Sequence, residues 1–101
     1  MVKYVYLWIL YLSFLNSQEF VVRPYLQNVT QNSIYILWET DSGIESKVEW
    51  GEWQTLGEIT IGSTITSYNN NRIHTVQLSD LNSSTRYYYR VVTGSLTSDI
   101  Y

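Results

Sequence analysis

Apolar and polar residues alternate with a period of two in several short stretches of this chain. In residues 33–39, Ile34, Ile36 and Trp38 occupy every second position and would share one face of a strand. In residues 46–50, two apolar residues alternate with two charged ones, which is typical of a strand buried on one side only. We therefore predict two strands, with Ile34, Ile36 and Trp38 facing a core.

A third stretch, residues 59–66, is rich in β-branched side chains and is interrupted by Gly62, where we predict a bulge or bend. The preceding residues 51–57 show no helical period and are predicted to form a connection. The run Asn69-Asn70-Asn71 is a turn signal, because asparagine tolerates the left-handed backbone and bonds its own main chain. This part of the chain is therefore predicted to be a bent strand followed by a turn.

Two more strands follow, and a last one closes the chain. Apolar and polar residues alternate in 75–79, and the next strand would place Tyr87, Tyr89 and Val91 on one face. Its opposite face would carry Arg86, Tyr88, Arg90 and Val92. A final strand is predicted from Leu96 to Tyr101. All runs together give about seven strands and no helix, which predicts an all-β Greek-key sandwich.

Leu81 and Tyr87 have the spacing of a tyrosine corner, a feature of Greek-key sandwiches. Leu81 lies six residues before Tyr87, and residues 82–85 would form the corner between them. In such a corner the tyrosine hydroxyl bonds the backbone a few residues upstream and fixes the crossover between sheets. We interpret Tyr87 and Leu81 in this structural way, and a role of Tyr87 as a ligand or catalytic phenol is the alternative.

The first 17 residues have the composition of a secretory signal peptide. Lys3 precedes an uncharged, strongly apolar run from Tyr4 to Leu15, which a small polar pair, Asn16 and Ser17, follows. The run is shorter than the roughly 20 apolar residues of a membrane-spanning helix. We predict cleavage after Ser17, a domain spanning 18–101, no membrane span after cleavage, and a secreted or cell-envelope location. An uncleaved anchor is the alternative.

Composition allows one small domain and disfavours nucleic acid as a partner. The 101 residues are 45% apolar and 15% charged, enough for a single core. Beyond residue 17 the chain carries five basic and nine acidic side chains, a net charge of −4, with no basic cluster to neutralise phosphates.

The chain has no cysteine, so its core must hold it together without disulfides. This favours a fibronectin type III type of sandwich over an immunoglobulin domain with its disulfide.

Three runs of residues resemble one protein family. The opening Arg23-Pro24-Tyr25-Leu26-Gln27 continues to Thr40, and the runs His74–Leu81 and Ser84–Val91 look like a closing strand pair. This pattern resembles the N-terminal domain of purple acid phosphatases and related secreted metallophosphoesterases. The resemblance implies a non-catalytic, fibronectin type III-like domain that positions or stabilises a separate catalytic domain. The present chain stops before such a domain could begin, so we expect it to be truncated in its last strand.

By resemblance, the missing catalytic domain would hold two metal ions, iron with iron, zinc or manganese, and would hydrolyse phosphate esters through a metal-activated hydroxide. The family's metal-binding motifs, of the Gly-Asp and Gly-Asn-His kinds, do not occur in this sequence. We therefore predict no catalytic residue, no metal ligand and no cofactor in this chain. The full-length protein would be a metal-dependent acid phosphatase or phosphoesterase.

Several polar residues have a structural and a chemical interpretation. His74, the single histidine, is interpreted as structural or interfacial, with a metal ligand as the alternative. Asp41-Ser42-Gly43 is predicted to be a turn, although the same triplet surrounds the catalytic carboxylate of retroviral-type aspartic proteases. Glu45, Glu49 and Glu52 are interpreted as a solvated face, with a calcium site as the alternative.

Exposed aromatic and basic side chains are the candidates for binding. We predict that Trp53, Tyr88, Arg86 and Arg90 form the contact surface for the catalytic domain of the same polypeptide. The rival hypothesis is a free-standing adhesion or carbohydrate-binding module that uses Trp50, Trp53, Tyr68 and Tyr88. Asn28 and Asn82 also begin N-glycosylation acceptor tripeptides, which matter only in a eukaryotic secretory pathway.

Overall fold

The computed structural model describes residues 18–101. The predicted signal peptide, and the anchor considered beside it, fall on residues 1–17 and lie outside the described residues. Within the described range the chain forms eight β-strands: β1 (Phe20–Gln27), β2 (Ile34–Thr40), β3 (Lys47–Gly51), β4 (Glu58–Ile61), β5 (Ser63–Thr66), β6 (Arg72–Leu78), β7 (Tyr88–Thr93) and β8 (Leu96–Thr97). From residue 18 onward there is no helix that could cross a membrane.

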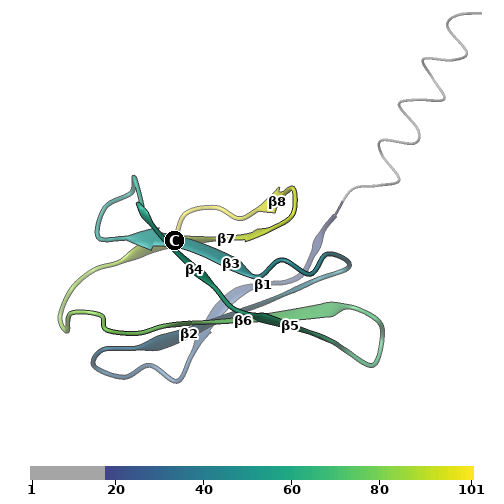
Figure 1. The fold of residues 1–101 in the computed structure, drawn as a ribbon, viewed down its shortest axis with the longest axis horizontal. Helices are drawn as coiled ribbons and strands as arrows, with labels where there is room; N and C mark the ends of the chain where they lie inside the picture. Colours follow the sequence, from purple (N-terminus) through teal and green to yellow (C-terminus); the bar gives the residue numbers. More distant parts are fainter. Residues whose placement is uncertain (1–17) are drawn as a thin grey trace, which may run out of the picture.

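The strands form two antiparallel sheets that lie one above the other (Figure 1). The first sheet has the order β1-β2-β6-β5 and the second has the order β4-β3-β7-β8. Strands distant in sequence are neighbours in both sheets, as β2 with β6 and β3 with β7, which is the signature of a Greek key. The prediction of an all-β, fibronectin type III-like Greek-key sandwich is confirmed.

The structure has one strand more than the about seven that the alternation predicts, because the stretch 59–66 divides at Gly62. β4 belongs to the second sheet and β5 to the first, so the chain changes sheets at this glycine. A Cβ at Gly62 would lie 2.0 Å from the backbone oxygen of Thr75, and its amide donates a hydrogen bond to the Ser46 oxygen at 2.8 Å. No residue with a side chain fits this close backbone approach.

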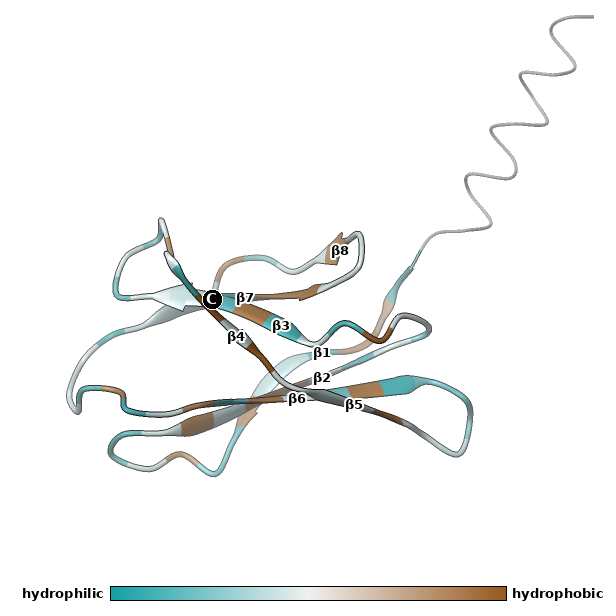
Figure 2. Cartoon of the chain, in the orientation of Figure 1, coloured by the Kyte–Doolittle hydropathy of each residue, from teal (hydrophilic) through white to brown (hydrophobic). Residues whose placement is uncertain are grey.

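The core lies between the sheets and is built from the predicted alternation. Ile36 and Trp38 of β2 and Val76 and Leu78 of β6 are buried from the first sheet, whereas Val48 and Val91 are buried from the second. Figure 2 shows hydrophobic segments on the strands of both layers and mostly hydrophilic connections. The indole Nε1–H of Trp38 also donates to Thr93 Oγ1 at 2.9 Å, a buried bond between the sheets.

The C-terminal part differs from the prediction at Tyr87, at Val92 and in the length of the last strand. β7 begins at Tyr88, so Tyr87 precedes the strand. Val92, predicted to lie on the outer face, is only 8% exposed; paired residues flank it on both sides, Lys47 of β3 and Thr97 of β8.

The last strand ends at Thr97 rather than at Tyr101. Its ladder is interrupted because the Ser98 hydroxyl, in place of a backbone oxygen, accepts the Val91 amide at 2.9 Å. The Ser98 amide still donates to the Val91 backbone oxygen at 3.0 Å. Tyr101 then exchanges two backbone hydrogen bonds with Tyr89, at 2.8 and 3.1 Å.

Candidate interaction surface

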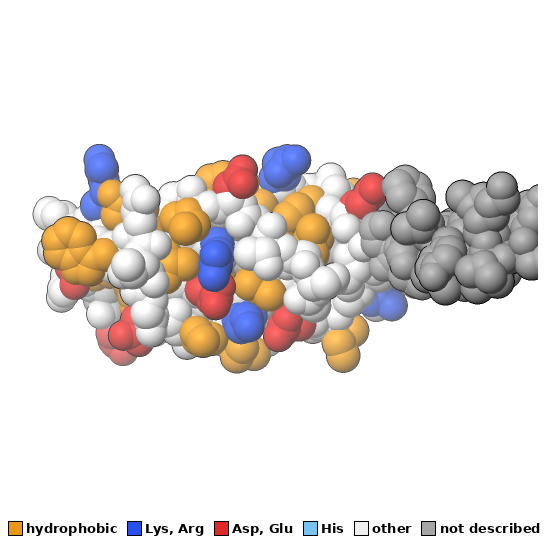
Figure 3. All heavy atoms as spheres, turned by 90° about the horizontal axis from the view of Figure 1, so that it is seen from above, with side chains coloured by type: hydrophobic (Ala, Val, Ile, Leu, Met, Phe, Trp, Pro, Cys, Tyr) orange, Lys and Arg blue, Asp and Glu red, His pale blue; other side chains and the backbone are white. Residues whose placement is uncertain are grey.

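The four residues predicted as a contact surface lie near one another but not in one cluster. Tyr88 and Arg90 project from the outer face of the second sheet, opposite Gly51 and Glu49 of β3. Trp53 stands on the β3–β4 connection and is 74% exposed. Arg86 is exposed, two residues before β7 begins. Figure 3, which views the molecule from the side of the second sheet, shows hydrophobic side chains interspersed with basic and acidic ones.

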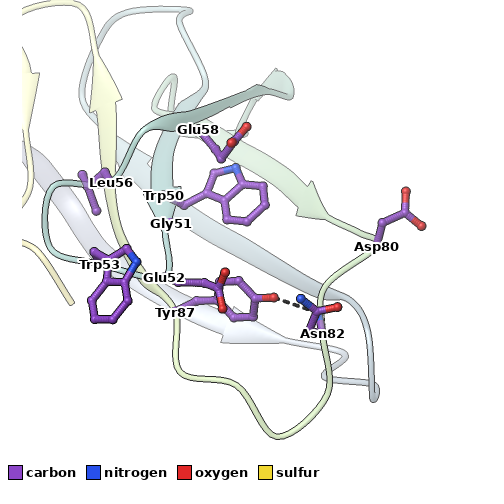
Figure 4. Close-up of a pocket in the computed structure, with 9 residues that line it drawn as sticks. All are labelled: Trp50, Gly51, Glu52, Trp53, Leu56, Glu58, Asp80, Asn82 and Tyr87. Carbon is purple, nitrogen blue, oxygen red and sulfur yellow. Dashed lines mark hydrogen bonds between the residues drawn. The ribbon is translucent and has the colours of Figure 1, made fainter.

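A hollow of about 340 Å³ opens where the β3–β4 connection meets the β6–β7 connection. Figure 4 shows the residues that line it: Trp50, Gly51, Glu52, Trp53, Leu56, Glu58, Asp80, Asn82 and Tyr87. We call this the aromatic hollow. Three of its nine lining residues are aromatic and three are acidic, and none is basic.

The backbone of the β3–β4 connection is fixed locally, which holds Trp53 at the rim. A Cβ at Gly51 would lie 2.2 Å from the Leu56 oxygen, so only glycine permits the loop to fold back here. Leu56 and Gly57 then adopt positive φ angles of 64° and 112°. The Leu56 amide donates to the Trp53 oxygen at 2.9 Å, closing a tight turn.

Trp50 and Tyr87 form the fixed inner part of the hollow. Their rings meet edge to face, with centroids 5.8 Å apart. The Trp50 indole donates to Thr60 Oγ1 at 3.0 Å, and the Tyr87 hydroxyl accepts the Asn82 backbone amide at 2.7 Å. The second bond has the geometry of a tyrosine corner, and Leu81 packs against the core beside it. Both rings are thus held in place by the protein's own hydrogen bonds.

Arg90 lies at a second hollow, of about 250 Å³, on the other side of the same connection. Its Nε donates to Glu49 Oε1 at 2.6 Å, across the β3–β7 pairing. Both side chains are partly exposed, so water screens the pair and its net contribution to stability is below about 1 kcal/mol. Leu56 of the connection and Glu58 of β4 line both this hollow and the aromatic hollow, so the two hollows are neighbours.

His74 is the third residue of β6, and it is fully buried. Its Nε2 lies 2.8 Å from Thr40 Oγ1, and because that hydroxyl donates to the Ser42 oxygen, Nε2 must carry the hydrogen. Its Nδ1 lies 2.8 Å from Ser46 Oγ and 3.2 Å from Thr64 Oγ1. All the hydrogen-bonding partners of the ring are neutral hydroxyls.

Burial, and secondarily the positive charge of Arg72, lower the pKa of His74 from 6.5 to about 4. The ring is therefore neutral at physiological pH, and it stacks on Trp38 with centroids 5.0 Å apart. Residues 18–101 contain no group of three or more histidine, cysteine, aspartate or glutamate side chains placed to hold a metal ion.

The acidic residues with alternative interpretations are separated and engaged locally. Asp41 follows β2 in a turn, and its Oδ1 accepts the Glu19 amide at 3.0 Å. Glu45 Oε1 accepts the Gly94 amide at 2.9 Å, whereas Glu49 is paired with Arg90. Glu52 alone of these lines the aromatic hollow.

The aromatic residues considered for carbohydrate binding do not form one platform. Trp50 and Trp53 share the aromatic hollow, and Tyr88 lies on the outer face of the second sheet. Tyr68 is fully exposed in the β5–β6 turn, at the opposite end of the sandwich from the β3–β4 connection (Figure 1). The glycosylation candidates Asn28 and Asn82 are both exposed, Asn28 after β1 and Asn82 beside the aromatic hollow.

Fold and surface together define a fibronectin type III-like sandwich with exposed aromatic and charged side chains at one end. The family model of the purple acid phosphatase N-terminal domain matches residues 21–101, and the chain belongs to this family. A comparison with curated proteins and another with solved structures gave no match. The resemblance noted in the opening and closing runs is therefore confirmed, and the family's metal-binding catalytic domain lies outside the matched residues.

Proposed function

We propose that this domain is the non-catalytic accessory domain of a secreted, metal-dependent acid phosphatase or phosphoesterase. In this proposal the domain positions or stabilises a catalytic domain of the same polypeptide, and that domain carries the two metal ions and the hydrolytic chemistry. The observation that supports it is the family match across residues 21–101, nearly the whole of the described chain. Secretion rests on the signal-like composition of residues 1–17.

The proposed contact surface consists of Trp53, Arg86, Tyr88 and Arg90. Tyr101 pairs with Tyr89 of β7, and Tyr88 and Arg90 flank Tyr89 on the outer face of the same strand. A domain joined after Tyr101 would therefore start beside two of the four residues. Exposed aromatic and arginine side chains are the types that contribute most to protein interfaces.

The first test reads the coding sequence beyond Tyr101. A Gly-Asp motif and a later Gly-Asn-His motif within one domain length are the expected result. A stop codon, or a further sandwich repeat, would refute the phosphatase assignment and leave an adhesion module as the better account.

The second test measures how substitutions in the proposed contact surface change the thermal stability of the full-length protein. The double substitution Trp53→Ala and Tyr88→Ala is expected to lower the melting temperature of the full-length protein, followed through its phosphatase activity, by about 2–4 °C. The reason is that two interface side chains are lost. Tyr68→Ala removes a fully exposed aromatic side chain at the other end of the sandwich and serves as the control. Equal melting temperatures for both variants would exclude this surface as the contact.

A further inference from the structure

The aromatic hollow presents three aromatic rings to any ligand that enters it. Two ring systems, Trp50 and Tyr87, are fixed in it, and their polar atoms already bond to Thr60 and Asn82. What they offer a ligand is therefore the face and edge of the rings. Trp53 adds a third ring at the rim, and it is 74% exposed. An aromatic face attracts a cation positioned within about 6 Å of its centre.

The charge in the hollow is entirely negative. Glu52, Glu58 and Asp80 all line it, and Figure 4 shows Glu52 and Glu58 on opposite sides of Trp50. The one ion pair formed within residues 18–101 joins Arg90 to Glu49, so none of these three carboxylates has a basic partner there. A concave surface lined by one sign of charge concentrates ions of the opposite sign.

Size and composition restrict the class of ligand. A volume of about 340 Å³ is at the lower end of small-molecule sites and suits one side chain. Three carboxylates repel phosphates and other anions. Within residues 18–101 no three histidine, cysteine, aspartate or glutamate side chains are placed to hold a metal ion, so the three carboxylates do not form a metal site.

We propose that the aromatic hollow binds the side chain of an arginine presented by a polypeptide partner. The planar guanidinium group stacks on aromatic faces and donates paired hydrogen bonds to carboxylates, and this hollow offers both. The inference goes beyond the proposed function, because it requires no catalytic domain and concerns residues that, Trp53 apart, are not in the contact surface.

The test uses the indole N–H signals of the 101-residue chain in two-dimensional NMR, assigned by single Trp→Phe substitutions. The probe is N-acetylarginine amide, and N-acetylcitrulline amide has the same shape without the charge. We expect saturable shifts for Trp50 and Trp53 with a dissociation constant of about 1–10 mM. The Trp38 signal should not shift, because its indole N–H is buried and donates a hydrogen bond to Thr93 Oγ1. The citrulline compound should cause no saturable shift.

Substitutions test whether the NMR shifts arise from binding in the aromatic hollow. Replacing Glu52 and Glu58 together by glutamine should weaken binding about fivefold or more, and Trp53→Ala should weaken it similarly. Glu19→Gln removes one charge far from the hollow and is expected to leave binding unchanged. An unmoved Trp38 signal in each variant shows that the fold is intact.

Three outcomes would overturn the inference that the hollow binds arginine. Equal binding of the arginine and citrulline compounds, or no saturable shift with arginine up to about 50 mM, would overturn the inference. Saturable binding of methyl β-glucoside without binding of arginine would also overturn it and would assign the hollow to a neutral sugar. None of these results depends on a phosphatase domain, so they leave the proposed function to its own tests.

Discussion

Acidification will destabilise this domain through its single histidine. His74 is fully buried, its hydrogen bonds go to neutral hydroxyls, and its ring stacks on Trp38. Burial, and secondarily the charge of Arg72, lower the pKa of His74 from 6.5 to about 4. The folded state therefore resists a proton that the unfolded chain accepts readily.

The sign and the size of the effect follow from this difference. Between pH 6.5 and about 4 the unfolded chain binds one more proton than the folded chain, so stability is complete above pH 6.5 and falls as the pH decreases toward 4. Since each pKa unit corresponds to about 1.4 kcal/mol, the loss across this window is about 3 kcal/mol. This is a large part of the 5–15 kcal/mol by which small domains are typically stable.

Two measurements check the prediction. The chain has one histidine, so NMR titration of its ring C–H signals gives the folded pKa without overlap. Urea unfolding, followed by tryptophan fluorescence at pH 7, 6, 5 and 4, gives the free energy of unfolding. In His74→Gln, which retains a donor and an acceptor but does not titrate, the slope between pH 7 and 5 should be nearly flat. A folded-state pKa near 6.5, or equal slopes in the two proteins, would refute the reasoning.

Three further predictions concern stability and are checked by urea unfolding at pH 7. Gly62→Ala should cost more than about 2 kcal/mol or prevent folding, because its Cβ would lie 2.0 Å from the Thr75 oxygen; a wild-type midpoint would contradict this. Tyr87→Phe should cost about 1–2 kcal/mol through the lost corner hydrogen bond, whereas Tyr88→Phe should change little. Arg90→Gln should change stability by less than about 1 kcal/mol, and a larger loss would show that the pair is not screened.

Periodicity predicted the parts of the fold in which one face of a strand is buried. Ile36 and Trp38 face the core as their alternation indicates, and the Asn69–Asn71 run forms a turn with Asn70 at a φ of 67°. The passage of one strand into two sheets was predicted only as a bend at Gly62. The reason is that the constraint on Gly62 comes from the Thr75 backbone of another strand, which no local pattern reveals.

The exposure of Trp53 could be predicted from the sequence, but the arrangement of the residues around it could not. Trp53 is the single aromatic residue of the connection 51–57, and it is exposed. The pairing of Arg90 with Glu49 depends on the β3–β7 register, which joins residues 41 positions apart. Asp80 reaches the aromatic hollow from the β6–β7 connection, and its sequence neighbours give no sign of this.

The crossing at Gly62 also makes the sandwich mechanically asymmetric. Along one long side, β4 runs directly into β5, so a single stretch of backbone joins the two layers there. Along the other side lie the edge strands β1 and β8, where the half-buried Gln18 side chain forms hydrogen bonds with Ser95 and Ser42. The layers should therefore separate transiently from the β1 and β8 side, with the Gly62 side acting as a hinge.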